Sequence, residues 1–493
     1  MSAKDTIKKL IAYDKLYDSV KTSFFYQAYK KYRAALADKL YDSPSKDFFV
    51  IGVTGTNGKT TTVNILHNIL NDHVAPTVAI STATIKIGNE DLVNEKKMTS
   101  LDNFDLQSLL ATAKERGCKI AIIEVSSHGL DQRRFEGITF DFAVLTNITR
   151  EHIDYHGSMN NYVETKKQLF KYVLANWKEN KYAAFSVDDR YGKKRFEEMA
   201  FDKKVSFSLQ SSAILKATRI EEHLEGTYFE FSYLGQKYSG TTQLIGSYNV
   251  SNILAALAVS TEIGLAIPLA LKSVESFRGV AGRMEPVYAN GVKYFIDFAH
   301  TPDGLEKTLE FAQKAKGNGK LITVFGAPGN RDKEKRPMMG DIAHKYADVI
   351  IVSDDDPDTE NRLKILHQIS YNFQENFSEE DKEIFIIPER KYAIQFCVDI
   401  AKPGDTVVFA GKGHEVAQLT NFGKRDWNDK KVLTQILQES GIALEDSEKI
   451  RHAFIQRIQE EKRSANHLTV EQYLEGAPVS SASSQKSALF TSS

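Results

Sequence analysis

The stretch IGVTGTNGKTTT at residues 51–62 is the part of the sequence that decides the fold. It ends the apolar run FFVIGVT and leads into TTVNILHNIL, whose pattern predicts a helix. A strand, a glycine-rich turn and a helix in this order place backbone N–H groups at a helix N-terminus, where they bind phosphate oxygens. The spacing departs from the common G-x-x-x-x-G-K-[ST] loop, since Gly52 stands one place early and position 53 is Val53. A fortuitous glycine turn is the alternative, but the strand and helix on either side favour a phosphate loop.

Seven residues of this loop are candidate nucleotide ligands. Lys59 is placed to neutralise the β- and γ-phosphates, and Thr60 offers its hydroxyl to Mg²⁺. The full set is Gly55, Thr56, Asn57, Gly58, Lys59, Thr60 and Thr61.

Composition excludes several classes of protein. The 493 residues predict two to four domains, and a net charge of -1 gives no pull toward nucleic acid or a membrane surface. The two cysteines, Cys118 and Cys397, lie in apolar runs and are expected to be buried thiols in a reducing compartment. No apolar run reaches 18 residues and the start is polar and rich in lysine, so we expect a cytoplasmic protein.

The order of the patterns predicts an α/β protein with four regions. Residues 1–45 are expected to form a helical extension. Residues 46–282 alternate strand and helix patterns around a mainly parallel sheet, with antiparallel hairpins over 205–245. Residues 283–442 restart the alternation and predict a Rossmann-like, doubly wound domain. Residues 443–493 predict a helix followed by a disordered tail.

Further motifs follow the loop, and together they resemble the Mur ligase family, whose members add amino acids to peptidoglycan precursors using ATP. The resemblance covers roughly residues 46–440, and EVSSHGL and GKGHE are similar to the MurE-like branch, which adds the third residue of the stem peptide. The motifs are EVSSHGL (124–130), TNITREHIDYHGS (146–158), YVETKKQLF (162–170), GSYNVSNILAA (246–256), GRME (282–285), DFAHTPDGL (297–305), FGAPGNRDKEKRPMMG (325–340), DDDPDTE (354–360) and GKGHE (411–415).

The resemblance implies a central ATPase domain of the phosphate-loop type and a two-step reaction. ATP phosphorylates a carboxylate, and an amine then displaces phosphate from the acyl phosphate, which requires charge neutralisation around the transferring group. The catalytic residues implied are Lys59, Glu124, His152 and Lys166, and the implied Mg²⁺ ligands are Thr60, Glu124, His152 and a carbamylated Lys166.

Each of these roles has a plainer alternative. A glutamate at a strand end is most often solvated, and Mg²⁺ prefers oxygen to the nitrogen of His152. Lys166 reads from its pattern as an exposed helix lysine, and Lys167 competes with it as the carbamylation site. The match of Tyr162 and Phe170 fixes the alignment on Lys166.

The resemblance also implies ligands for the nucleotide and for the acceptor. Asn249 would lie near the adenine, although it and Asn252 also read as helix caps. Arg283, Asp297 and His300 would close on the nucleotide at the domain junction. Acceptor contacts are implied for Ser126 and Arg134, for which a capping serine and a surface arginine are the alternatives, and for Thr99 and Ser100.

Recognition of the acceptor departs from the family pattern. Family members carry a UDP-binding domain of roughly a hundred residues before the loop, an ordinary size for a domain, whereas residues 1–50 precede it here. The TTP motif also reads MTSLDN (98–103). The sequence thus predicts a ligase for UDP-linked muramoyl-L-Ala-D-Glu or a related muramoyl peptide. The alternatives are a ligase for another carboxylate, with folylpolyglutamate- or cyanophycin-type chemistry, and an inert scaffold, which would have little reason to keep the catalytic set.

The amino acid added is expected to be a cationic diamino acid such as L-lysine. In members that use diaminopimelate, an Asp-Asn-Pro-Arg motif carries an arginine that forks onto the distal carboxylate. The matching residues here are Asp355, Asp356, Pro357 and Asp358, so an aspartate replaces the arginine. Gly411 and Glu415 complete the implied site; an acidic, solvated loop is the alternative. We expect a monomer with small-molecule partners only.

Overall fold

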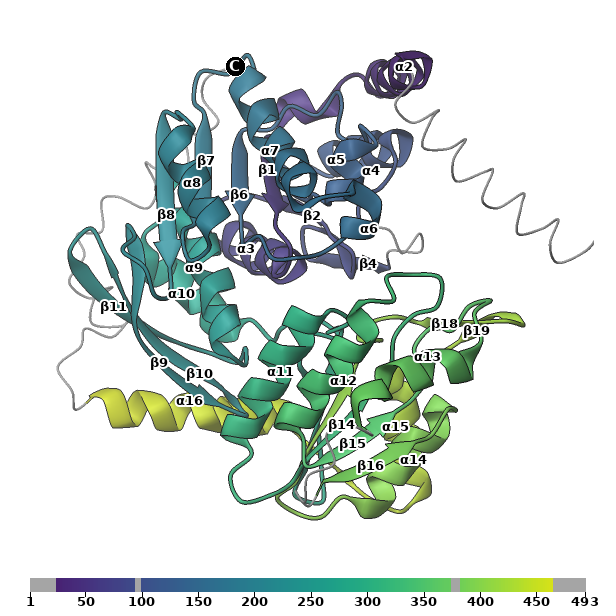
Figure 1. The fold of residues 1–493 in the computed structure, drawn as a ribbon. Helices are drawn as coiled ribbons and strands as arrows, with labels where there is room; N and C mark the ends of the chain where they lie inside the picture. Colours follow the sequence, from purple (N-terminus) through teal and green to yellow (C-terminus); the bar gives the residue numbers. More distant parts are fainter. Residues whose placement is uncertain (1–23, 94–98, 374–381, 464–493) are drawn as a thin grey trace, which may run out of the picture.

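The computed structural model describes residues 24–93, 99–373 and 382–463, and within them two large sheets organise the chain (Figure 1). We call the eleven-stranded sheet with its helices the central unit (residues 24–276), and the seven-stranded sheet with its helices the second unit (residues 285–445). In Figure 1 the central unit lies above and the second unit, in green, lies below. The α/β class expected from the sequence is confirmed.

The sheet of the central unit has the order β11-β10-β9-β8-β7-β6-β1-β5-β2-β3-β4. Its middle is parallel, and both edges are antiparallel hairpins. The parallel strands are β1 (Phe49–Thr54), β2 (Thr77–Ile80), β5 (Ile120–Glu124), β6 (Phe142–Leu145), β7 (Tyr182–Ser186) and β8 (Lys203–Ser208). The edges are β3 (Thr84–Ile87) with β4 (Glu90–Val93), and β9 (Leu215–His223), β10 (Gly226–Tyr233) and β11 (Gln236–Thr242).

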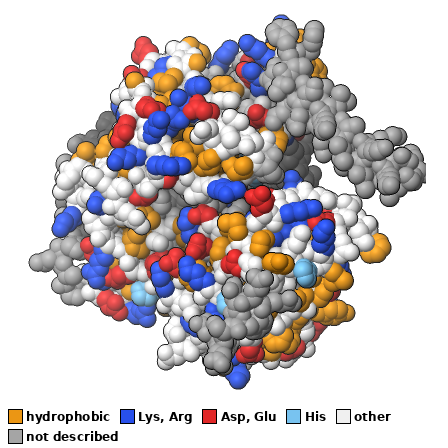
Figure 2. Space-filling model, viewed as in Figure 1, with side chains coloured by type: hydrophobic (Ala, Val, Ile, Leu, Met, Phe, Trp, Pro, Cys, Tyr) orange, Lys and Arg blue, Asp and Glu red, His pale blue; other side chains and the backbone are white. Residues whose placement is uncertain are grey.

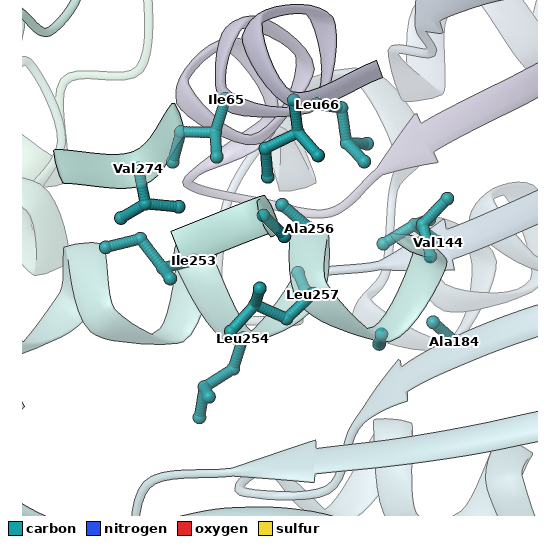
Figure 3. Packing of buried hydrophobic residues seen from close by; sticks show 14 of the residues in the cluster. Ile65, Leu66, Val144, Ala184, Ile253, Leu254, Ala256, Leu257 and Val274 are labelled. Carbon is teal, nitrogen blue, oxygen red and sulfur yellow. The ribbon is translucent and has the colours of Figure 1, made fainter. Parts of the chain in front are cut away.

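Helices cover both faces of this sheet. On one face, Val274 of α10 lies between Ile65 of α3 and Ile253 of α9, within one buried apolar cluster (Figure 3). Ala256 of α9 faces Leu66 of α3, and the buried alanines beside it in sequence, Ala255 and Ala258, leave room for neighbouring elements to pack closely against α9 (Figure 3). The helices are α2 (Phe24–Leu40), α3 (Lys59–His73), α4 (Asn103–Glu115), α5 (Ser127–Asp131), α6 (Ile153–His156), α7 (Met159–Ala175), α8 (Arg190–Glu198), α9 (Ser247–Glu262), α10 (Ile267–Ser276) and the 3₁₀ turn η1 (Pro44–Asp47).

The sheet of the second unit has the order β16-β15-β14-β17-β13-β12-β20, parallel from β16 to β13 and antiparallel at β12 and β20. The strands are β12 (Glu285–Ala289), β13 (Val292–Asp297), β14 (Leu321–Phe325), β15 (Val349–Val352), β16 (Glu383–Ile386), β17 (Thr406–Ala410) and β20 (Leu444–Glu445), beside a hairpin of β18 (Ala417–Thr420) and β19 (Gly423–Asp426). The helices are α11 (Pro302–Ala315), α12 (Lys335–Tyr346), α13 (Arg362–Ile369), α14 (Arg390–Ile400), α15 (Asp429–Glu439) and the 3₁₀ turn η2 (Tyr371–Phe373).

The last described helix, α16 (Ser447–Arg463), leaves the second unit and packs beneath β10 of the central unit (Figure 1). Its Phe454, Ile455 and Ile458 bury an apolar cluster with Tyr228. The helix expected within 443–463 is confirmed, and the tail expected to be disordered lies outside the described residues, as does the start of the helical extension.

Acidic and basic side chains are interspersed on the face shown in Figure 2, over both units. Among the described residues, no helix is long and apolar enough to cross a membrane. The predicted antiparallel hairpins are confirmed as β9, β10 and β11, but residues 205–208 of the predicted range belong to β8, which pairs parallel with β7 and β9. The edge strands β3, β4, β12 and β20 were not anticipated. The region boundaries expected from the sequence stay predictions.

Candidate active site

A cavity of about 1350 Å³ lies where the two units face each other. The phosphate loop and the carboxyl ends of β5 and β6 form its wall in the central unit. The N-terminal ends of α11 and α12 and the end of β17 form the opposite wall. Because parallel strands gather their carboxyl ends at one sheet edge, motifs far apart in sequence meet here.

The phosphate loop needs its glycines at two positions. Gly58 begins α3 with φ 85°, and a Cβ there would lie 2.1 Å from Asn252 Oδ1. A Cβ on Gly55 would lie 1.9 Å from Thr146 Oγ1. Only glycine fits such a conformation and approach. The Lys59 ammonium donates to the carbonyls of Gly55 (3.1 Å) and Thr56 (2.7 Å), which holds it over the loop.

Two residues that directly follow β6, Thr146 and Asn147, hold the loop backbone by hydrogen bonds. Thr146 Oγ1 donates to Asn57 O (2.6 Å), Asn57 N donates to Asn147 Oδ1 (2.9 Å), and Asn147 Nδ2 donates to Asn57 O (3.0 Å). Thr56 Oγ1 lies 3.0 Å from the Tyr162 hydroxyl. Thr146 and Asn147 were missed as loop anchors, although they open the TNITREH motif.

Glu124 ends β5 and is 2% exposed. Its Oε2 accepts hydrogen bonds from Thr60 Oγ1 (2.9 Å) and from the backbone N–H of Thr82 (2.8 Å). The reading of Glu124 as a merely solvated strand end is therefore wrong. A buried carboxylate beside a hydroxyl forms a pair of oxygen donors at the loop, which is the ligand chemistry that Mg²⁺ prefers.

Three histidines of the central unit lie close together, and two of them, His128 and His152, line the same cavity as Glu124 and Thr60. The rings of His128 and His152 lie 4.6 Å apart and those of His128 and His156 lie 5.7 Å apart, measured between centroids. Burial lowers the pKa of His128 and of His152 to about 3, and neighbouring cationic groups act in the same sense, so both imidazoles are neutral. His152 lines the cavity at the start of α6, with φ 55°.

Lys166 is fully enclosed, which overturns its interpretation as an exposed helix lysine. Its Nζ donates to Gly55 O (2.6 Å) and lies 4.6 Å from the centre of the Tyr162 ring. Burial, aided by the charge of Lys59, lowers the Lys166 pKa well below its usual value. Lys167 instead points to the surface and lies 3.9 Å from Glu164.

Asn249 and Asn252 do not act as plain caps, because Gly246 stands at the cap of α9. Both are buried: Asn249 Nδ2 donates to Ile245 O (2.8 Å), and Asn252 Nδ2 donates to Asn249 Oδ1 (2.9 Å). Asn249 does not line the cavity, whereas Asn252 packs directly behind Gly58 of the loop.

The residues expected to close on the nucleotide meet at the start of the second unit. Arg283 lies 4.6 Å from the centre of the Phe298 ring and lines the cavity together with His300. Burial lowers the pKa of His300 to about 4. Asp297 lies deeper, where its carboxylate accepts from Thr308 Oγ1 (2.7 Å) and Met284 N (3.2 Å), and burial raises its pKa.

The residues expected to bind the acceptor form one continuous wall. Ser126 caps α5 by accepting from Gly129 N (3.0 Å), and its hydroxyl lies 2.8 Å from that of Ser100. Arg134 is tied to this wall because its Nη1 donates to Ser100 O (2.5 Å). Thr99, Ser100, Ser126 and Arg134 all line the cavity, so capping of α5 does not keep Ser126 away from it.

An acidic cluster forms the opposite end of the cavity. Asp355, Asp356 and Glu415 have oxygens within 4.8 Å of one another, and among the described residues they form the group spaced to share one ion. The enclosed Lys412 ammonium contacts Glu415 and lies 2.8 Å from Asp356 and 3.8 Å from Asp355. Burial raises the pKa of Glu415 to about 7. The GKGHE motif contains Lys412, but the sequence alone did not indicate a role for this residue.

The other expected amino-acid ligands divide between the cavity and its surroundings. Gly411 lines the cavity beside Asp355. Asp358 does not line it; its φ is 51° and its carboxylate accepts from Asn330 Nδ2 (3.1 Å). The Asp358 side chain therefore lies outside the set of residues that line the cavity.

The chain is similar to known proteins of one family over most of its length. Residues 53–260 match the Mur ligase middle domain, and residues 282–413 match the family described as Mur ligase, glutamate ligase domain. A UDP-N-acetylmuramoyl-L-alanyl-D-glutamate--2,6-diaminopimelate ligase of Haemophilus influenzae is 36% identical over 420 residues, covering 84% of this chain and 83% of the relative. One of Halalkalibacterium halodurans is 36% identical, covering 82% of each.

Solved structures give the same result for the fold. A structure of a diaminopimelate ligase with the same name is 29% identical with a TM-score of 0.57, covering 80% of this chain and 79% of that one. The MurF ligase of Thermotoga maritima in complex with ADP has a TM-score of 0.62 at 20% identity, covering 82% of this chain and 84% of that one. The chain belongs to the Mur ligase family.

Proposed function

We propose that this protein joins a diamino acid with a cationic side chain, such as L-lysine, to the carboxylate of a muramoyl-L-Ala-D-Glu peptide. As a Mur ligase it is an ATP-dependent, ADP-forming ligase. The observation that carries the proposal is one cavity with the phosphate loop at one end and the acidic cluster at the other.

The loop end suits phosphoryl transfer. Backbone N–H groups at the start of α3 and the Lys59 ammonium provide the positive surroundings that the γ-phosphoryl group needs. Thr60 and Glu124 would hold a Mg²⁺ ion, which when bound supplies further charge neutralisation. His152 is neutral and lines the same cavity, so its imidazole is available as a ligand there.

Lys166 is proposed to be carbamylated. The modification adds CO₂ to the neutral amine and releases a proton, leaving a carbamate anion. A neutral amine is favoured here because burial lowers the Lys166 pKa, and an anion at this position would face the Lys59 ammonium. The modification would also remove an ammonium from the neighbourhood of Glu124 and Thr60.

The acceptor is proposed to lie along the wall of Thr99, Ser100, Ser126 and Arg134, which brings its carboxylate toward the loop. The guanidinium of Arg134 suits the carboxylates of a glutamyl peptide. The relatives named as muramoyl-L-alanyl-D-glutamate ligases support this class of acceptor.

The amino acid is proposed to place its side-chain ammonium at the acidic cluster. Lys412 offsets one of the three carboxylates, so the ionised cluster keeps a net negative charge that attracts a cation. Asp358 adds a further negative charge outside this group. The relatives' names favour diaminopimelate, whose second carboxylate would meet these acids, so selectivity is the point to test.

The test is the ratio of kcat/KM for L-lysine to kcat/KM for meso-diaminopimelate. We expect wild type to favour lysine and Asp358→Arg to shift the ratio toward diaminopimelate. Thr359→Arg, one residue along at an exposed position, is the matched control and should leave the ratio unchanged. A wild type that prefers diaminopimelate refutes the charge argument, and equal shifts in both variants would show that Asp358 does not read the side chain.

A further inference from the structure

One hydrogen bond joins the phosphate loop to the second unit. Asn57 Nδ2 donates to Asp303 Oδ2 at 2.6 Å, between residues 246 positions apart. The Asp303 side chain is 29% exposed. A second cross-unit pair, Arg150 with Glu334 at 3.3 Å, has side chains that are 71% and 82% exposed, so solvent screens it far more. Of these two contacts, the Asn57–Asp303 bond is therefore the less screened by solvent.

Both partners are held in place before they meet. The backbone of Asn57 is clamped on both its N–H and its carbonyl by Thr146 and Asn147, so its side-chain amide is the part that reaches across. Asp303 sits in the first turn of α11, where the helix dipole favours a carboxylate, and Lys307 one turn later donates to the same oxygen at 2.9 Å. The contact thus joins two pre-ordered groups at little cost in conformational entropy.

We propose that Asp303 is a positioning residue of the ligase reaction, which holds the phosphate loop through Asn57 when the two units meet. Asp303 is distinct from the groups expected to touch the nucleotide, since it acts on the side chain of a loop residue. The loop is then fully ordered only when the amino-acid end of the cavity stands opposite it. The kinetic test of this inference rests on the proposed function, whereas its hydrogen–deuterium exchange test needs no substrate.

Loss of the bond should lower kcat more than it changes the KM for ATP, because the contact belongs to the assembled cavity in which chemistry occurs. A hydrogen bond to a charged acceptor predicts a roughly ten- to hundredfold loss of kcat in Asp303→Ala. Asp303→Asn keeps an acceptor oxygen without the charge and should retain an intermediate rate. Glu225→Ala is the matched control and should stay near wild type, because it breaks a third cross-unit pair, with Lys293 at 3.0 Å, that does not line the cavity.

A double-mutant cycle tests the coupling. If Asp303 acts through Asn57, the Asn57→Ala/Asp303→Ala variant should be no slower than the slower single variant. Multiplied losses in the double variant, or an unchanged kcat in Asp303→Ala, overturn the proposal. Equal melting temperatures across the series exclude a folding defect as the cause of a loss.

Hydrogen–deuterium exchange tests the same contact without any substrate. We expect faster amide exchange over residues 55–59 in Asp303→Ala than in wild type, and no change over these residues in Glu225→Ala. Unchanged exchange in Asp303→Ala overturns the proposal even if the wild-type enzyme is active. A wild type that ligates none of the tested substrates, with loop exchange that still depends on Asp303, would instead contradict the proposed function alone.

Discussion

Lys59 illustrates how much one residue of the loop contributes. Its ammonium is held over the loop by the carbonyls of Gly55 and Thr56, where the proposed function places the phosphates. We expect Lys59→Ala to fold normally and to lose activity on the order of 10²–10³-fold, as loss of one preorganised charge at a transferring group commonly does. Phosphate release measured at saturating substrates checks this, and near-normal turnover in a folded variant would refute the assignment of the loop.

Lys166 and Lys167 form a natural pair for a second prediction. Lys166→Ala should abolish ligation, and Lys166→Glu or added short-chain carboxylates should restore part of it by returning a negative ligand. Lys167→Ala, on the outer side of α7, is the control and should stay active. Intact-mass measurement and a crystal structure that show an unmodified Lys166 in fully active enzyme would end the carbamylation hypothesis.

Glu415 predicts a pH dependence of amino-acid binding. Burial raises its pKa to about 7, so its carboxyl is neutral below that pH and anionic above it. A cationic amino acid should therefore bind more tightly, with a falling KM, as the pH rises through about 7. The ratio of KM for L-lysine in wild type to that in Glu415→Gln isolates this titration from that of the substrate. Parallel profiles in the two enzymes would contradict it.

At the scale of elements, the sequence predicted what local patterns determine. Alternating residues such as those of GTYFEFSYLG gave the β10 hairpin, and buried apolar runs gave the parallel strands. The edge strands were missed because they form only by pairing with a neighbouring strand. For example, β20 has two residues, which pair with β12. Their own sequence carries too little pattern to reveal them.

The candidate site shows the same division. Motif residues could be placed together because strand ends meet at one edge of a sheet. The Lys412 ammonium inside the acidic cluster and the Asn57–Asp303 bond could not be predicted, because each depends on how separate segments approach one another. The interpretation of Lys166 as an exposed lysine was wrong for the same reason, because the loop, a separate segment of the chain, encloses its side chain together with Tyr162.

The packing of helix α16 against the central unit predicts how a substitution there changes stability. Phe454 is 3% exposed and packs over Gly226, where an added Cβ would lie 2.7 Å from its ring. Phe454→Ala should lower the free energy of unfolding by about 3–5 kcal/mol through lost burial and a cavity. Phe422→Ala, at a residue 95% exposed in the β18–β19 turn, should change it by less than about 0.5 kcal/mol. Denaturant unfolding of both variants compares them, and equal losses would contradict the packing assigned to α16.

Both units line one cavity, and the proposed function assigns phosphoryl transfer to the loop of the central unit and amine recognition to the second unit. Neither unit carries both, so the arrangement of the units is what makes an amide ligase. The account therefore requires that phosphate release depend on the acceptor and that amide formation depend on both the acceptor and the amino acid.

The most direct test measures phosphate release and product mass with ATP, Mg²⁺, L-lysine and UDP-linked muramoyl-L-Ala-D-Glu, with the UDP-free peptide in parallel. Ligation through an acyl phosphate predicts one phosphate released per amide formed, and a product with the summed mass of acceptor and lysine less one water. Omission of the acceptor should abolish phosphate release, and omission of lysine should abolish the amide. Phosphate release that continues without any acceptor, or no amide with either acceptor and either lysine or diaminopimelate, would contradict it.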